Sequence, residues 1–392
     1  MFDFVCFSIN NWEKRRARKQ QFMLHLAKRN DVGRILYIEP PQNIFRLIFF
    51  PLAELKNSEF RKRWRRALTF KLELIADKLY LFTPVFFIPF SFRLQFIYNI
   101  NLFIASLIVK VKIRQLGLKN IIIWLYHPFD RPLLKWFKKI KMSVFDWAEA
   151  WSEYFNEYSE SKRDKIRSLE EKIVQDVNIV LVVSQRLLHE ALKLNKQSYQ
   201  VLDGTVPEIF NHSNKKIPSE IKDLPHPILA YVGGVYNRVD LDLIADLSEA
   251  LDYCTIVLLG KIYFPPEILM KITCKKNVLL LGVKDYNELP DYMANFDVFI
   301  LPYITELVTS PATKIYDYLA VGKPIVSTNL VELDKFKGYI EVAQTNEEFI
   351  QLVKKSLNEN SLALQQKRRA MARQNSWTLR AGEIMAIIGK KA

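Results

Sequence analysis

Short apolar runs alternate with amphipathic segments along most of the chain. In the second half, the apolar runs predict strands at residues 228–232, 255–259, 277–281 and 298–301. Segments with helical spacing predict helices near residues 239–251 and 287–295, in the intervals between these strands. Short apolar strands separated by helices are typical of a parallel sheet that is covered on both faces. Ligands of such a sheet bind beyond the carboxyl ends of its strands.

The first half shows a similar pattern with more interruptions. Apolar runs predict strands at residues 2–8, 33–38, 121–124, 143–145, 178–183 and 199–202. Helical spacing predicts helices at residues 14–29, 91–116, 149–174 and 185–194. Residues 203–226 are rich in Pro, Asn, Ser and Lys, which is typical of a linker between domains. Since 392 residues exceed what one hydrophobic core usually serves, we expect two α/β domains.

Residues 310–328 predict a capped helix followed by a glycine stop and a strand. Ser310 is a good N-cap and Pro311 suits the first helical position, so the free N–H groups of the first turn form a ready anion site. Lys314 and Asp317 are three residues apart and share a face near the positive end of this helix. One side chain can meet a phosphate and the other a ribose. The alternative is an ordinary crossover helix whose two charged side chains are solvated or paired.

The net charge of +15 is distributed unevenly along the chain. Residues 1–150 hold 27 Lys and Arg against 11 Asp and Glu, whereas residues 201–350 hold 13 against 21. A basic segment rich in aromatic residues suits nucleic acid or an anionic membrane surface. The chain has no helix-turn-helix, zinc-knuckle or RNA-binding signature, so we expect no nucleic-acid partner.

Two features favour a membrane surface. The apolar, aromatic residues 45–52 precede the basic run of residues 61–66, as in interfacial anchors. Residues 79–109 are also strongly apolar, but prolines and polar residues interrupt them before the roughly 18 to 20 apolar residues of a spanning helix are reached. We therefore expect peripheral binding to the membrane. The alternative is a buried helix of the first domain and a solvated charge run.

The expected compartment is the cytoplasm. Three cysteines, Cys6, Cys254 and Cys274, are too few and too scattered for a disulfide framework or a metal cluster. Residues 1–9 predict a strand, and the basic residues come after it, which is not the order of a signal peptide.

One segment of the second half carries a family resemblance. Residues 314–326, Lys-Ile-Tyr-Asp-Tyr-Leu-Ala-Val-Gly-Lys-Pro-Ile-Val, resemble the Lys-x-x-Glu-Tyr-Leu-Ala-x-Gly-Lys-Pro-Val-Val segment of nucleotide-sugar-dependent glycosyltransferases with the GT-B fold. The chain resembles glycosyltransferases of teichuronic acid and related bacterial surface polysaccharide synthesis. The resemblance implies two Rossmann-like domains, residues 1–205 and 206–375, whose parallel sheets face a cleft. It also implies a terminal helix, residues 376–391, that packs back on the first domain.

In that family the second domain binds the donor nucleotide. The Gly-Gly turn after the first strand of this domain lines the diphosphate, and the start of the helix at residues 310–314 binds it. The acidic residue of this helix binds the ribose, and backbone in the segment that matches residues 281–290 contacts the base. Lys261 follows a strand where relatives place a basic residue on the diphosphate, although a plain surface lysine is an equal alternative. The donor-binding residues expected from this resemblance are Gly233, Gly234, Arg238, Lys261, Val283, Ser310, Thr313, Lys314 and Asp317.

The first domain resembles the acceptor side of the family. His127 lies in Trp-Leu-Tyr-His-Pro after a predicted strand and resembles the histidine that reaches the donor sugar. Asp146 resembles a strand-terminal acid, and we expect both side chains to be catalytic. Asn10, Asn11 and Trp12 form the loop after the first strand and are expected on the acceptor side.

Two further points concern the chemistry. Retaining members of the family carry a first acid eight positions before the ribose binder, where this chain has Thr309, and Glu306 is the nearest alternative. Asp240-Leu241-Asp242 has the form of a metal-binding Asp-x-Asp but lies on an amphipathic helix, so a solvated face is the preferred interpretation. With no other cluster at ligand spacing, we expect metal-independent chemistry and no cofactor besides the donor substrate.

The resemblance implies a retaining glycosyltransferase that moves a sugar from a nucleoside diphosphate donor to a lipid-linked or polysaccharide acceptor. Two alternatives stay open. One is a catalytically inactive GT-B scaffold that binds at the membrane, and the other is a GT-B sugar-nucleotide epimerase.

Overall fold

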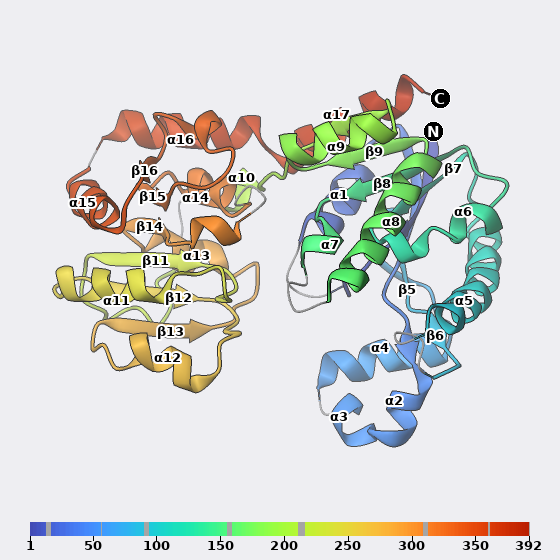
Figure 1. Cartoon of the computed structure of the whole chain (residues 1–392), viewed down its shortest axis with the longest axis horizontal. Helices are drawn as coiled ribbons and strands as arrows, with labels where there is room; N and C mark the ends of the chain where they lie inside the picture. Colours follow the sequence, from blue (N-terminus) through green and yellow to red (C-terminus); the bar gives the residue numbers. More distant parts are fainter. Residues whose placement is uncertain are drawn as a thin grey trace. The chain divides into compact units, whose positions relative to one another are not determined.

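The computed structural model describes residues 1–12, 17–55, 57–89, 94–154, 159–210, 216–308, 313–359 and 361–391. The chain forms two compact units. The first consists of Met1–Leu202 together with Arg380–Ala392, and the second of Asp203–Leu379. Figure 1 shows both units, with labels on most of their helices and strands.

The first unit is built on an eight-stranded sheet with the order β10-β9-β8-β7-β1-β2-β5-β4. Its strands are β1 (Phe2–Phe7), β2 (Val32–Ile38), β4 (Glu73–Ala76), β5 (Leu79–Phe82), β7 (Ile121–Leu125), β8 (Met142–Trp147), β9 (Ile179–Val182) and β10 (Ser198–Gln200). All neighbouring strands are parallel except β4, which pairs with β5 in the antiparallel sense. The pair β3 (Gln42–Asn43) and β6 (Val85–Phe86) forms a separate small sheet.

Helices cover both faces of this sheet because the strands are apolar on both faces. The described helices of the unit are α1 (Arg18–Ala27), α2 (Ile44–Phe49), α3 (Pro51–Leu55), α4 (Ser58–Leu68), α5 (Gln95–Gln115), α6 (Leu133–Trp136), α7 (Trp151–Tyr154), α8 (Glu160–Asp176), α9 (Gln185–Leu194) and most of α17 (Trp377–Gly389). Alternate residues of β1 point to opposite faces. Val5 and Phe7 pack with α5, α6, α8 and α9 in one hydrophobic cluster, whereas Phe4 on the other face contacts Trp124, which packs on Phe22 of α1.

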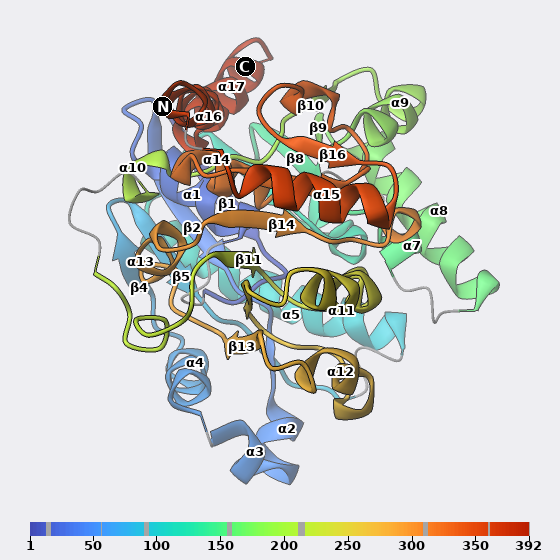
Figure 2. The same ribbon diagram turned by 90° about the vertical axis from the view of Figure 1, so that its left-hand side faces the viewer.

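Two expectations for the first unit need correction. The helix predicted at residues 149–174 is interrupted, since α7 ends at Tyr154, α8 begins at Glu160, and the residues between them lie outside the described part of the chain. The segment between β2 and β5 contains the short helices α2 and α3, the helix α4 and the strand β4, none of which the apolar pattern predicted. Figure 2 shows α2, α3 and α4 as a group at one end of this unit.

The second unit contains a six-stranded parallel sheet with the order β13-β12-β11-β14-β15-β16. Its strands are β11 (Ile228–Val232), β12 (Thr255–Leu259), β13 (Val278–Gly282), β14 (Val298–Leu301), β15 (Ile325–Thr328) and β16 (Glu341–Ala343). The described helices are α10 (Pro207–Phe210), α11 (Leu241–Ala250), α12 (Pro266–Thr273), α13 (Leu289–Ala294), α14 (Ile315–Val321), α15 (Asn346–Ser356) and α16 (Leu362–Gln374). Every strand predicted in this half is present, because the apolar runs are fully or partly buried in one core.

Candidate active site

A glycine-lined loop lies at the carboxyl ends of β11 and β12. Gly233 and Gly260 have φ angles of +149° and +154°, which residues with a side chain rarely adopt. A Cβ atom on Gly260 would lie 2.0 Å from the carbonyl oxygen of Gly233. The two loops are joined by a hydrogen bond of 2.8 Å from the Gly233 N–H to the carbonyl of Leu259. Both glycines are therefore required for the backbones to lie this close together.

Lys314 reaches this loop from the segment before α14. A Cβ atom on Gly233 would lie 2.6 Å from the Lys314 ammonium nitrogen, so the lysine occupies the space that the glycine leaves open. The ammonium donates hydrogen bonds to the hydroxyl of Tyr231, at 2.6 Å, and to the hydroxyl of Tyr303. It also lies 4.0 Å from the ring centre of Tyr231. Lys314 and the Gly-Gly turn, each predicted to bind the donor, therefore lie side by side in the structure.

The two tyrosines hold Lys314 in place as neutral groups. Tyr231 donates its own proton to the carbonyl of Gly234 at 2.8 Å, which leaves its oxygen as an acceptor for the lysine. Burial raises the pKa of both the Tyr231 and the Tyr303 phenol above the usual value. Their partnership with Lys314 therefore leaves the positive charge of the ammonium undiminished. The sequence pattern did not single out either tyrosine, because both read as apolar core positions.

The start of α14 differs from the prediction. The helix begins at Ile315, and Thr313 and Lys314 form a turn before it. The predicted cap Ser310 lies outside the described residues, as does Pro311. Thr313 is exposed. The basic group at this position is therefore contributed by a turn, and α14 is shorter at its N-terminal end than predicted.

Asp317 is oriented toward the chain segment that leads into β11. Its carboxylate accepts a hydrogen bond of 2.6 Å from the hydroxyl of Thr205. Burial, and to a smaller degree the charge of Asp203, raise the pKa of this carboxyl to about 7. Thr205 is fully buried and was not predicted as a site residue. The side chains of Lys314 and Asp317 thus have different partners although they lie on neighbouring turns.

The other predicted donor residues follow the strands of the same sheet edge. Arg238 lies 5.7 Å from the ring of Tyr236, and the exposed Lys261 lies 4.8 Å from the ring of Tyr263. Val283 follows β13 and is 64% exposed. Parallel strands place all three at the edge that carries Gly233.

The Asp-x-Asp sequence has structural contacts. Asp240 caps α11 by accepting from the N–H of Leu243 at 2.9 Å, and Asp242 forms an ion pair of 2.6 Å with Lys271. In the described ranges, no group of three or more His, Cys, Asp or Glu side chains is arranged to hold a metal ion.

In the first unit, His127 follows β7 and caps the short 3₁₀ helix Pro128–Asp130. Its Nδ1 accepts from the N–H of Phe129 at 3.2 Å, so the neutral ring carries its proton on Nε2. Burial, together with the charge of Lys19, lowers the pKa of His127 to about 4. The ring packs edge-on against Phe129 and Trp151. At neutral pH this side chain is a hydrogen-bond donor through Nε2 and carries no charge.

Asp146, the other predicted catalytic residue, ends β8 in a buried ion pair. Both carboxylate oxygens lie 3.1 Å from Nε of Arg18, and one lies 3.0 Å from Nη2. The carboxylate of Asp146 is fully buried, and the side chain of Arg18 is 6% exposed. An acid held in this way orients α1 against β8. This ion pair gives Asp146 a structural role. The direct catalytic role of Asp146 stays a prediction.

Hydrogen bonds hold the predicted acceptor-side loop in place. Tyr37 donates to the carbonyl of Asn10 at 3.0 Å, and Gln20 donates to the carbonyl of Asn11 at 2.8 Å. The N–H of Trp12 donates to Glu39 at 2.6 Å. Glu39 follows β2, is 1% exposed, and also accepts from Arg66 at 2.8 Å. Sequence analysis did not identify this buried acid, which has no motif around it.

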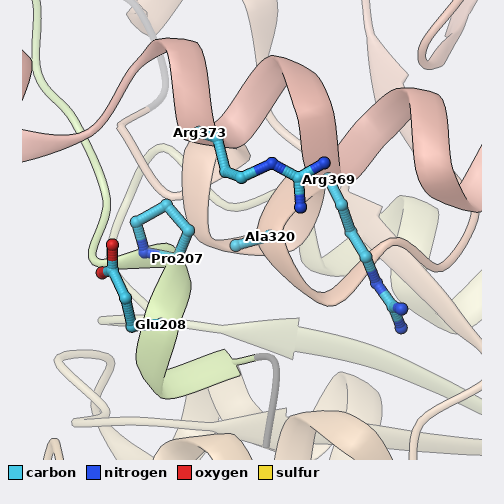
Figure 3. Close-up of a pocket in the computed structure, with 5 residues that line it drawn as sticks. All are labelled: Pro207, Glu208, Ala320, Arg369 and Arg373. Carbon is cyan, nitrogen blue, oxygen red and sulfur yellow. The ribbon is translucent and has the colours of Figure 1, made fainter.

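A small cavity of about 80 Å³ lies away from this site. Figure 3 shows its lining residues Pro207, Glu208, Ala320, Arg369 and Arg373. Arg369 donates to the carbonyl of Val321, the last residue of α14. The cavity is therefore at the end of α14 that is opposite Lys314.

The fold and the glycine-lined loop define a class of enzyme. Residues 226–359 match the family described as "Glycosyl transferases group 1". The chain is similar in structure to sucrose-phosphate synthase from Thermosynechococcus elongatus, with a TM-score of 0.71, 12% identity, and 100% and 99% of the two chains covered. It is also similar to HepE from Anabaena in complex with UDP-glucose, with a TM-score of 0.66, 12% identity and full coverage of both chains. The predicted GT-B fold is confirmed, and the protein is a glycosyltransferase.

Among individual proteins, the chain is similar to TuaH of Bacillus subtilis (strain 168). The name of TuaH assigns it to teichuronic acid biosynthesis as a glycosyltransferase. The two sequences are 26% identical over 276 residues, which are 66% of this chain and 69% of TuaH. This similarity agrees with the resemblance found in residues 314–326.

Proposed function

We propose that the protein transfers a sugar from a nucleoside diphosphate donor to a lipid-linked or polysaccharide acceptor in the synthesis of a bacterial surface polysaccharide. The observation that carries the donor assignment is the Lys314 ammonium beside the open backbone of Gly233, at the carboxyl end of β11. The likeness to TuaH supports the acceptor class. The likeness to HepE, which was solved with UDP-glucose, supports a nucleotide sugar as donor.

In this proposal, positive side chains stabilise the leaving group. Negative charge accumulates on the diphosphate as the glycosidic bond breaks, so cations that are already in position lower the barrier. Lys314 is held by two phenols and need not reorganise. Arg238 and Lys261, which follow neighbouring strands, supply further charge. We propose that this chemistry proceeds without a metal ion and, by the family resemblance, with retention of the anomeric configuration.

Asp317 is proposed to bind the ribose hydroxyls of the donor. A carboxylate is an acceptor for two hydroxyl groups, and its present partner, the Thr205 hydroxyl, is the kind of group that a ribose hydroxyl replaces. Since the pKa of Asp317 is raised to about 7, a growing fraction of this acceptor ionises between pH 6 and 8. We therefore expect nucleotide affinity to rise with pH through this range.

His127 is proposed to donate a hydrogen bond from Nε2 to a hydroxyl of the donor sugar. Its neutral state and the Phe129 N–H bond to Nδ1 favour this direction of donation. Asp146 is proposed to act through Arg18 and α1, as a positioning residue for the loop of Asn10, Asn11 and Trp12 on the acceptor side.

We also propose that the protein acts at the cytoplasmic face of an anionic membrane. Ile48 and Phe49 of α2, Leu52 of α3 and Phe50 between the two helices are between 61% and 88% exposed, next to the basic helix α4. The basic run is only partly available for lipids, because Arg66 is paired with the buried Glu39 and with Glu73. The charges that suit headgroups are those of the exposed Arg61, Lys62 and Arg65.

The test is release of nucleoside diphosphate from a panel of nucleotide sugars, with and without lipid-linked acceptors. We expect one donor to be turned over by the wild type and Lys314→Ala to lose most of this activity. Binding of a nucleotide sugar without turnover under any condition would instead favour the inactive scaffold. Unchanged nucleoside diphosphate affinity in both Lys314→Ala and Asp317→Ala would contradict the donor site.

A further inference from the structure

The helix α5 has an apolar face that the core does not cover. Within the described residues, α5 is the helix that is long and apolar enough to cross a membrane by length and composition. The inner face of α5 is not available to lipid, because it packs in the core of the first unit through Leu102, Ala105, Val109 and Ile113. The opposite face carries five apolar side chains that are 42% to 62% exposed. They are Phe96, Ile100, Phe103, Leu107 and Val111, called the outer stripe below.

The spacing of the outer stripe is that of one continuous helix face. Its members follow one another at intervals of four, three, four and four residues, which keeps them within a narrow arc over four turns. Single exposed apolar residues are common on soluble proteins, but a contiguous apolar surface of this length marks a contact site. Figure 1 shows α5 at the periphery of the first unit.

The charges around the outer stripe suit an anionic lipid surface. Toward its C-terminal end α5 contains Lys110, Lys112 and Arg114, of which Lys112 lies over the buried ring of Phe82, and the helix contains no Asp or Glu. The apolar tip formed by α2 and α3 belongs to the same unit and is followed by the basic helix α4. Apolar side chains flanked by basic ones are the composition of interfacial helices, whose apolar face enters the headgroup region while the cations remain at the surface.

The N-terminal turn of α5 is also connected to the loop of His127. Tyr98, which is two residues from Phe96 and lies on the other side of the helix, donates a hydrogen bond of 2.8 Å to Asp130. The Tyr98 ring packs edge-on against Phe129, with ring centres 6.0 Å apart. Phe129 and Asp130 belong to the 3₁₀ helix that His127 caps. The segment that is proposed to handle the sugar is therefore about one helix diameter, roughly 10 Å, from a surface that binds the outer stripe.

We propose that the outer stripe of α5 is a membrane-contact surface that holds the acceptor side of the enzyme against an anionic bilayer. This inference rests on the proposed transfer to a membrane-borne acceptor and deepens it. A lipid-linked acceptor presents its reactive end at the headgroup level. Contact through α5 brings that level to within about one helix diameter of the segment that His127 caps.

The experiment is sedimentation of the full-length protein with vesicles of phosphatidylcholine, or of phosphatidylcholine mixed with phosphatidylglycerol. The variant carries Ile100→Gln and Leu107→Gln, which keep helix propensity and alter only exposed positions. The matched control carries Ile268→Gln and Met270→Gln, two similarly exposed apolar residues of α12 in the other unit. Thermal unfolding followed by circular dichroism checks that all three proteins are folded.

We expect the wild type and the control to bind the mixed vesicles and the α5 variant to bind about tenfold more weakly, because two partly exposed aliphatic side chains lose their transfer into the interface. Equal binding by the α5 variant and the wild type overturns the proposal. A wild type that fails to bind the vesicles but forms a dimer that the α5 variant dissolves also overturns it, since the stripe is then a protein interface.

Titration with UDP separates this inference from the proposed function. We expect all three proteins to bind UDP equally, because no donor-site residue is changed. Failure of the wild type to bind UDP or any other nucleoside diphosphate counts against the proposed function. The vesicle assay then still tests the membrane contact of α5, because that assay does not depend on nucleotide binding.

Discussion

Replacement of Gly233 by alanine tests the link between backbone conformation and donor binding. The new Cβ would lie 2.6 Å from the Lys314 ammonium nitrogen and 2.8 Å from its Cε, so the lysine must leave its position between the two tyrosines. The φ angle of +149° adds backbone strain of about 1–3 kcal/mol for any residue with a side chain. The substitution therefore affects both folding stability and the placement of one positive charge.

The two effects have different magnitudes and different readouts. Loss of a charge-assisted contact to the diphosphate costs about 1.5–3 kcal/mol, which is roughly a 10- to 150-fold loss of affinity. Isothermal titration with UDP measures this loss, and urea unfolding measures the loss of stability. We expect both to be large in Gly233→Ala.

Gly338→Ala is the matched control. Gly338 also has a positive φ, +77°, in the same unit, but its Cβ would meet only the Lys367 ammonium nitrogen at 3.6 Å. We expect about 1 kcal/mol of destabilisation and unchanged UDP affinity. If folded Gly233→Ala binds UDP as tightly as the wild type, Lys314 does not contact the diphosphate and the reasoning is wrong.

Three further predictions concern single side chains. Tyr303→Phe keeps the ring but removes one acceptor from the lysine ammonium, so UDP affinity should fall several-fold while uridine affinity stays constant; an equal fall for uridine would indicate general damage to the site. Asp317 binds its proton more tightly in the folded state than in the unfolded chain, so its contribution makes the free energy of unfolding decrease as pH rises from about 4 to 7, by at most about 4 kcal/mol. Asp317→Asn should remove that part of the pH dependence, and an unchanged pH profile in urea unfolding would contradict the raised pKa. Arg66→Ala should cost about 3 kcal/mol because it leaves the carboxylate of Glu39 buried without this partner, whereas the exposed Arg65→Ala on the same helix should be nearly neutral; equal stabilities would show that the pair is dispensable.

The strands of the second unit were predictable because their signal is local. Each is a short run of apolar residues between turn formers, and the parallel sheet follows from helices that alternate with strands. The donor segment was predicted from the resemblance of residues 314–326 to a family segment, and such a resemblance needs no knowledge of distant contacts. The first unit was harder, since α2, α3 and α4 form an insertion whose exposed apolar residues resemble core positions when only the pattern is available.

The side-chain partners at the site could not be predicted in this way. Lys314 meets Tyr231, 83 residues away in sequence, and Asp317 meets Thr205, 112 residues away. Asp146 meets Arg18 across 128 residues. Such pairs depend on strand order and on the direction of each side chain, and neither is encoded in the spacing of neighbouring residues.

Hydrophobic periodicity was thus sufficient for the α/β class, and the resemblance of residues 314–326 to a family segment was needed for the GT-B fold and the enzyme class. Folding in three dimensions was needed to show that neutral phenols hold the lysine, that the proposed ribose acid faces a threonine, and that one side of α5 is left uncovered. The physical reason is the distance along the chain over which each interaction acts. Hydrophobic periodicity acts within one element, whereas burial, hydrogen bonding and the resulting pKa values are set by groups that only the packed chain brings together.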